Sequence, residues 1–210
     1  MQAWLQQIRR AKAIAVIRTP RWDWGLPMAT AAIAGGLDLV EITWNSDRPA
    51  ALIQQLRHTF PNQLIGAGTL LTVAQVEQAI AAGAQFLFTP HINPALIAVA
   101  RQHHIPLVAG ALTPTEIVTA WQAGATCVKV FPVNAVGGAA YIHSLQAPLG
   151  DIPLIPTGGV TVENAASFLR AGAIAVGLSS TLFPTAVLQT QQWSTIEQHA
   201  AALMQTLVSM

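Results

Sequence analysis

The sequence has few charged residues and few cysteines, and both shortages exclude classes of protein. Charged residues make up 9% of the 210 residues and apolar residues 52%, against a charged share of about 25% in ordinary soluble domains. A formal net charge of +1 offers no basic field to nucleic acid and no polybasic patch to a membrane. One cysteine excludes an intrachain disulfide and argues against a cysteine-built metal site. We therefore expect one domain over residues 1–210, with no nucleic-acid or membrane partner and no metal.

Long apolar runs are also lacking, because Gly, Pro or a charge interrupts each one well short of the about 20 residues that a spanning helix needs. The first residues, MQAWLQQIRRAKAIAVIR, have no long apolar segment after their charges, so a signal peptide is not expected. These features indicate a cytoplasmic protein. The high apolar share further indicates a surface covered by a partner subunit.

Short β-branched runs are abundant, and they alternate with Ala-rich segments of helical length. The runs are residues 14–18, 37–43, 64–69, 86–90, 106–112, 127–132, 153–159 and 173–179. Eight nearly continuous apolar strands separated by helices predict a parallel sheet covered on both faces. A closed (β/α)8 TIM barrel is the economical form. An open doubly wound sheet is the alternative, although no glycine-rich dinucleotide fingerprint follows the first run.

Helix signals fall between these runs. Helical composition is found at residues 73–82, 94–103 and 161–171. Thr72 and Thr161 resemble the residues that cap helix N-termini. An additional N-terminal helix and a C-terminal helix over residues 191–208 complete the expected α/β architecture.

The run CVKVFP (127–132) places a lysine in an otherwise apolar strand. The chain has two lysines, Lys12 and Lys129, against eight arginines, so Lys129 is not part of a general basic surface. Lysine is rarely buried unless it is paired or used chemically. Arg18, Glu41 and Lys129 all fall at the C-terminal ends of predicted strands, which is where active sites of such barrels form. Because side chains alternate along a strand, Lys129 and Glu41 can face the same barrel interior.

Several roles are open to this lysine. Burial lowers the pKa of an amine, and a neutral amine can form a Schiff base with a ketone while Glu41 transfers protons. Alternatively, Lys129 extends to the barrel rim or pairs with Glu41 in a non-catalytic phosphosugar-binding barrel. A third possibility is a barrel enzyme of another kind, in which Lys129 is an electrostatic anchor for the substrate.

Two glycine-rich segments follow the last two predicted strands, TGGV (157–160) and GLSS (177–180). Loops at these two positions commonly bind phosphate in this barrel, because backbone N–H groups converge there. Gly158 and Gly159 would let the backbone approach an anion closely, and the Ser179 hydroxyl could donate a hydrogen bond.

Together these segments resemble the family of 2-keto-3-deoxy-6-phosphogluconate (KDPG) and 4-hydroxy-2-oxoglutarate (KHG) aldolases, over nearly the whole chain. The motifs concerned are AVIR (15–18), AGGLDLVEIT (34–43), GAGT (66–69), TP (89–90), GATCVKVFPVNAVGG (124–138), TGGV and GLSS. The resemblance implies a Schiff base on Lys129 and acid–base catalysis by Glu41. It further implies substrate contacts from Thr69, Pro90 and Phe131, and phosphate contacts from Thr157, Gly158, Gly159 and Ser179. The expected protein is a homotrimer without cofactor or metal that cleaves the phosphorylated sugar acid to pyruvate and glyceraldehyde 3-phosphate, with 4-hydroxy-2-oxoglutarate as a further substrate.

One position departs from this pattern. Many KDPG aldolases carry an arginine four residues after the glutamate, and here that residue is Asn45, followed by Ser46. The Asn-Ser pair is similar to aldolases for the epimer 2-dehydro-3-deoxy-6-phosphogalactonate, and Arg18 resembles a substrate ligand of that subgroup. Arg48 is the other residue that could replace the missing charge. The aldolase class is expected either way, and the epimer stays open.

Overall fold

The computed structural model describes residues 2–209, in which eight parallel strands form a barrel. The strands are β1 (Ala13–Ile17), β2 (Leu39–Thr43), β3 (Leu64–Gly68), β4 (Leu87–Phe88), β5 (Leu107–Ala111), β6 (Cys127–Val130), β7 (Leu154–Pro156) and β8 (Val176–Leu178). Their order around the sheet is β7-β6-β5-β4-β3-β2-β1-β8. A parallel bridge between Thr157 and Gly177 joins the two remaining edges. The predicted (β/α)8 barrel is confirmed, and the open sheet is excluded.

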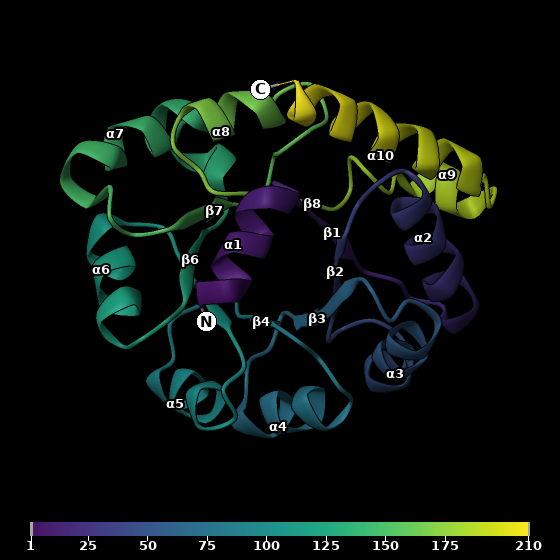
Figure 1. Cartoon of the computed structure of the whole chain (residues 1–210), viewed down its shortest axis with the longest axis horizontal. Coiled ribbons are helices and arrows are strands. Elements are labelled where there is room, and N and C mark those ends of the chain that lie inside the picture. Colours follow the sequence, from purple (N-terminus) through teal and green to yellow (C-terminus); the bar gives the residue numbers. More distant parts are fainter. Residues whose placement is uncertain (1, 210) are drawn as a thin grey trace.

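Helices surround the strands on the outside, except for the N-terminal helix, which lies over one end of the barrel (Figure 1). They are α1 (Gln2–Ala11), α2 (Trp22–Ala34), α3 (Pro49–Thr59), α4 (Val73–Ala81), α5 (Pro94–Gln102), α6 (Pro114–Gln122), α7 (Ala139–Leu149), α8 (Ala165–Arg170), α9 (Thr185–Gln189) and α10 (Trp193–Val208), with a 3-10 turn η1 (Val133–Val136). Among the described residues, no helix is long and apolar enough to cross a membrane.

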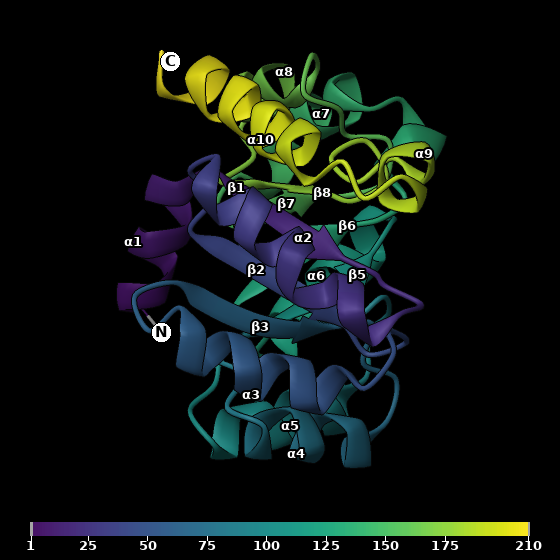
Figure 2. The same cartoon turned by 90° about the vertical axis from the view of Figure 1, so that its right-hand side faces the viewer.

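The N-terminal helix α1 lies across one end of the barrel, as the views in Figures 1 and 2 agree. Its residues Trp4 and Ile8 are buried with the side chains of the barrel interior, and the Trp4 ring lies 6.1 Å from that of Phe86 on the inner face. The closed end is the N-terminal one for the strands, so the opposite end stays available for a site.

Alternation along each strand divides the core into two parts. On β1, Ile14 and Val16 point into the barrel, whereas Ala13, Ala15 and Ile17 belong to the layer between strands and helices. Both sets are buried. This explains why the strands read as continuous apolar runs in the sequence.

Local signals set most helix ends, with one correction. Thr72 and Gln75 form the reciprocal bonds of a capping box at the start of α4, as the sequence indicated. The predicted helix over 161–171 was wrong at its start, because α8 begins at Ala165. Thr161 and Asn164 exchange backbone–side-chain hydrogen bonds of 2.7 and 3.2 Å, and these close a turn before the helix instead of capping it. The helix α9 and the turn η1 were not predicted.

Candidate active site

A cavity of about 350 Å³ opens at the C-terminal end of the barrel. Ten of the eleven predicted site residues line it: Arg18, Glu41, Thr69, Pro90, Lys129, Phe131, Thr157, Gly158, Gly159 and Ser179. They come from seven different strand ends or the loops that follow. Convergence of the strand ends in a parallel barrel is sufficient to bring them together.

Lys129 points into this cavity from β6 and is only 6% exposed. The flanking strands place Gly110 of β5 and Ile155 of β7 opposite it, so neither contributes a charge. Its Nζ lies 4.8 Å from the centre of the Phe131 ring. Burial is the main cause that lowers the pKa of the Lys129 amine, Arg18 lowers it further, and Glu41 opposes both. The site thus favours the neutral amine, which is the nucleophilic form.

Glu41 enters the same cavity from β2 and is 1% exposed. Its Oε1 is buried without a hydrogen-bond partner among the described residues. Space for the carboxyl depends on Gly68 of β3, where an added Cβ would overlap Oε1 and Cδ. Burial raises the pKa of Glu41, while the positive charges of Lys129 and Arg18 act in the opposite direction. A carboxyl with a raised pKa holds its proton to higher pH than an exposed one, which suits it to donate and accept protons in a reaction.

Lys129 and Glu41 are close neighbours without forming a closed ion pair. Among residues 2–209, no nitrogen–oxygen contact within 4.0 Å joins them. Each nevertheless influences the pKa of the other. The two groups therefore leave room for a reacting carbon between or above them, which a tight ion pair would not.

The two glycine loops form another wall of the cavity. Gly158 and Gly159 have positive φ angles of 86° and 83°, which glycine adopts without strain. A Cβ on Gly159 would lie 2.5 Å from that of Asn134, and one on Gly177 would lie 2.8 Å from the Thr157 hydroxyl. Gly158 and Gly159 line the cavity together with Thr157, Gly177 and Ser179, and the neighbours of Gly159 and Gly177 leave no space for a side chain at these two positions.

Thr69 is a non-glycine residue with a positive φ of 58°, directly after β3. Such a conformation costs on the order of 1 kcal/mol and is found preferentially at functional sites. It places Thr69 on the cavity wall, across from the glycine loops that follow β7 and β8.

Asn45 is the predicted site residue that the main cavity does not include. It lines an adjoining cavity of about 420 Å³, together with Trp24 and Phe183, and the two cavities share Arg18, Ser179 and Ser180. Arg48 lines neither of them. Its side chain is 70% exposed, 3.9 Å from an Asp47 oxygen, so the proposal that it supplies the missing charge is not supported.

Ser180 was missed by the sequence analysis, although it lines both cavities. The signal was the second serine of GLSS, which pattern alone does not distinguish from a turn residue. Val16 and Val160 also contribute apolar lining.

Fold and site together define a class: a (β/α)8-barrel protein with a buried lysine and a buried carboxyl at the end of the barrel where such enzymes carry out catalysis. The sequence model of the KDPG and KHG aldolase family matches residues 5–199. The chain belongs to that family.

Named relatives and solved structures agree with this assignment. The chain is 33% identical to the 2-dehydro-3-deoxy-phosphogluconate aldolase of Haemophilus influenzae over 91% of both chains. It is 38% identical to the 2-dehydro-3-deoxy-6-phosphogalactonate aldolase of Escherichia coli K12, over 81% of this chain and 83% of that one. The structure superposes on the Legionella pneumophila KDPG aldolase, captured with pyruvate as a covalent carbinolamine, with a TM-score of 0.87, 29% identity, and coverage of 95% and 97%. A native KDPGal structure gives a TM-score of 0.86 at 35% identity, covering 94% of both chains.

Proposed function

We propose that this protein is a class I aldolase that cleaves a 2-keto-3-deoxy-6-phospho sugar acid through a Schiff base on Lys129. The observation that carries the proposal is the burial of Lys129 and Glu41 in one cavity, with the pKa of the amine lowered and that of the carboxyl raised. Both shifts favour the protonation states that imine formation at neutral pH requires.

In the cleavage direction, the Lys129 Nζ attacks the C2 carbonyl and forms a carbinolamine. Loss of water, for which Glu41 supplies a proton, gives an iminium ion. Glu41 then accepts the proton of the C4 hydroxyl, directly or through water, and the C3–C4 bond breaks. The electrons of that bond move to the iminium nitrogen and leave an enamine, and the aldehyde departs. Protonation of the enamine at C3 and hydrolysis release pyruvate and restore the free amine.

The rest of the substrate would occupy the cavity walls. Arg18 and Thr69 bind the carboxylate end or a neighbouring oxygen, and Phe131 and Pro90 line the reacting carbons. Thr157, Gly158, Gly159 and Ser179 bind the phosphate through backbone N–H groups and hydroxyls. The positive φ angles of the two glycines and the absence of a Cβ there support this placement.

The gluconate-derived substrate, KDPG, is the first candidate, with glyceraldehyde 3-phosphate as the second product and 4-hydroxy-2-oxoglutarate as a further substrate. The galactonate-derived epimer is the second, and two observations favour it. Asn45 stands where many KDPG aldolases have arginine, in a cavity next to the active site. The identity with the galactonate-type aldolase of E. coli is 38% over 81% of this chain, against 36% over 78% for the gluconate-type enzyme of Treponema pallidum. Asn45 would then contact the hydroxyls that distinguish the epimers.

A coupled assay with lactate dehydrogenase, which consumes pyruvate, tests the function and the substrate together. We expect pyruvate from at least one phosphorylated epimer, and a large loss of rate in Lys129→Met. Asn45→Arg should shift the kcat/KM ratio toward the gluconate epimer. Unchanged turnover in Lys129→Met would overturn the Schiff-base mechanism. Ligand-induced thermal stabilisation without any turnover would instead identify a phosphosugar-binding barrel.

We also propose a homotrimer. The low charged share of 9% and the exposed Trp121 and Leu71 support an interface between copies. Light scattering coupled to size exclusion tests it, and a monomer at micromolar concentration contradicts it.

A further inference from the structure

Arg18 lies at the junction of the two cavities, yet nothing ties down its side chain. It is an exposed residue that follows β1 directly and lines both cavities. Among residues 2–209, no hydrogen bond or ion pair holds its guanidinium. Since no side-chain contact orients the guanidinium, the direction in which the Arg18 side chain leaves the backbone decides which cavity it can reach. That direction depends on what fixes the Arg18–Thr19 peptide.

Hydrogen bonds from the loop after β2 fix that peptide and the Thr19–Pro20 peptide that follows it. The backbone N–H of Thr19 donates to Ser46 Oγ at 3.1 Å, and the carbonyl of Thr19 accepts from the backbone N–H of Asp47 at 2.8 Å. Ser46 Oγ is itself 3.2 Å from Thr43 Oγ1 at the end of β2. Thr19, Thr43 and Ser46 are all buried, so water cannot readily replace these bonds.

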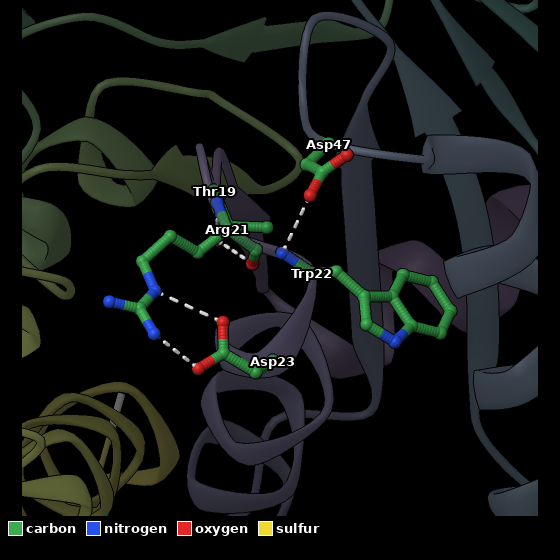
Figure 3. A network of polar contacts seen from close by, with 5 residues as sticks. All are labelled: Thr19, Arg21, Trp22, Asp23 and Asp47. Carbon is green, nitrogen blue, oxygen red and sulfur yellow. Dashed lines mark hydrogen bonds and ion pairs between the residues drawn. The ribbon is translucent and has the colours of Figure 1, made fainter.

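Asp47 adds a third bond between the same two loops. Its Oδ2 accepts from the backbone N–H of Trp22, the first residue of α2, at 3.0 Å (Figure 3). The N-cap residue Arg21 makes no capping bond with its own side chain and is instead paired with Asp23. Asp47 thus supplies from the neighbouring loop the acceptor that α2 lacks locally. The turn from Arg18 to Trp22 is held at both ends.

We propose that Ser46 and Asp47 are positioning residues, which hold Arg18 over the cavity so that it can bind the carboxylate of the keto acid. The inference rests on the proposed function and adds to it a role for the second half of the Asn-Ser pair. Asn45 lines the adjoining cavity, whereas Ser46 and Asp47 act through the backbone of the β1–α2 loop.

The charge of Arg18 gives this role a signature that lost stability alone would not produce. The charged groups that act on Lys129 are Glu41 from β2 and Arg18 from β1, and Arg18 lowers the pKa of the amine. If Arg18 moves away, the amine holds its proton to higher pH. The rate of imine formation should then reach its half-maximum at a higher pH than in the wild type.

Borohydride trapping of pyruvate, followed by intact mass over a range of pH and pyruvate concentration, measures both effects. In Asp47→Ala we expect half-saturation to rise about 10-fold, equivalent to about 1.4 kcal/mol, with the pH midpoint displaced upward. Asp47→Asn, which keeps an acceptor oxygen for Trp22, should restore both values. Arg48→Ala is the comparison variant: it removes an exposed cation that lies 3.9 Å from Asp47 and 5.9 Å from the centre of the Trp22 ring, but it leaves the acceptor oxygen for the Trp22 N–H in place, so both values should stay as in the wild type.

The same measurement in an Arg18→Met background shows whether Asp47 acts through Arg18. There, Asp47→Ala should add no further change in half-saturation or pH midpoint. Ser46→Ala removes the acceptor of the Thr19 N–H and keeps the Asp47 carboxylate, and it should change half-saturation and pH midpoint in the same direction as Asp47→Ala. A lower Tm with unchanged half-saturation and pH midpoint in Asp47→Ala and Ser46→Ala overturns the positioning role. Failure of the wild type to trap pyruvate overturns the proposed function, and this inference with it.

Discussion

Replacing Gly68 with alanine tests whether the barrel reserves space for the Glu41 carboxyl. The added Cβ would overlap Oε1 and Cδ of Glu41 and lie 2.7 Å from its Cγ. Glu41 is 1% exposed and lies against the backbone of β3, so it can avoid the methyl group only by leaving its position. Overpacking of this kind costs about 1–3 kcal/mol. Displacing the acid–base group should also reduce kcat by about 10²–10⁴-fold.

A double-mutant cycle with Glu41→Ala isolates the cause. Gly68 does not have a positive φ, so alanine suits its backbone once the carboxyl is gone. In the Glu41→Ala background, Gly68→Ala should then be neutral or should stabilise the fold by up to about 1 kcal/mol. Equilibrium unfolding in urea gives the four free energies. Equal costs of Gly68→Ala in both backgrounds would refute the reasoning.

Two further predictions concern charge and the phosphate wall. The pKa of Lys129 is lower in the folded protein than in the unfolded chain, so the buried amine destabilises the fold increasingly as pH falls from the unfolded pKa through the folded one. The Tm of Lys129→Met, measured against pH, should therefore rise relative to that of the wild type as the pH is lowered. A difference in Tm that stays constant with pH would contradict this. Gly159 has a φ of 83°, and an added Cβ would lie 2.5 Å from the Cβ of Asn134. Gly159→Ala should therefore raise KM for the phosphorylated substrate about 10-fold without altering pyruvate trapping. Gly137→Ala is its control, since φ is 104° but nothing lies within 4 Å of the added Cβ; equal effects of the two variants would exclude a specific role of the Gly159 loop.

The arrangement of the strands was largely readable from the sequence. Arg18 follows β1, and Glu41 and Lys129 lie within β2 and β6. Parallel strands that close into a barrel bring such residues to one interior and one end, whatever the helices do. The alternation that put Lys129 inside with Cys127 follows from the period of a strand alone.

What the sequence did not reveal depends on contacts between distant segments. The closing bridge of Thr157 with Gly177, the fit of Gly68 against Glu41 and the bond from Thr19 to Ser46 each join residues that no local pattern connects. Asn45 was expected at the active site, and its place in the adjoining cavity follows from how the loop after β2 turns. The start of α8 was predicted too early for a local reason. Thr161 and Asn164 form hydrogen bonds of the kind found at a helix N-cap, but these bonds close a turn before the helix.

The central claim is that Lys129 is the nucleophile, and peptide mapping after borohydride reduction with pyruvate tests it most directly. We predict one reduced pyruvate adduct per chain, on the peptide that contains Lys129, and none on Lys12, the other lysine of the chain. The Lys129→Met variant should remain unmodified. An adduct absent from folded wild-type protein, or found on Lys12 instead, would contradict the account.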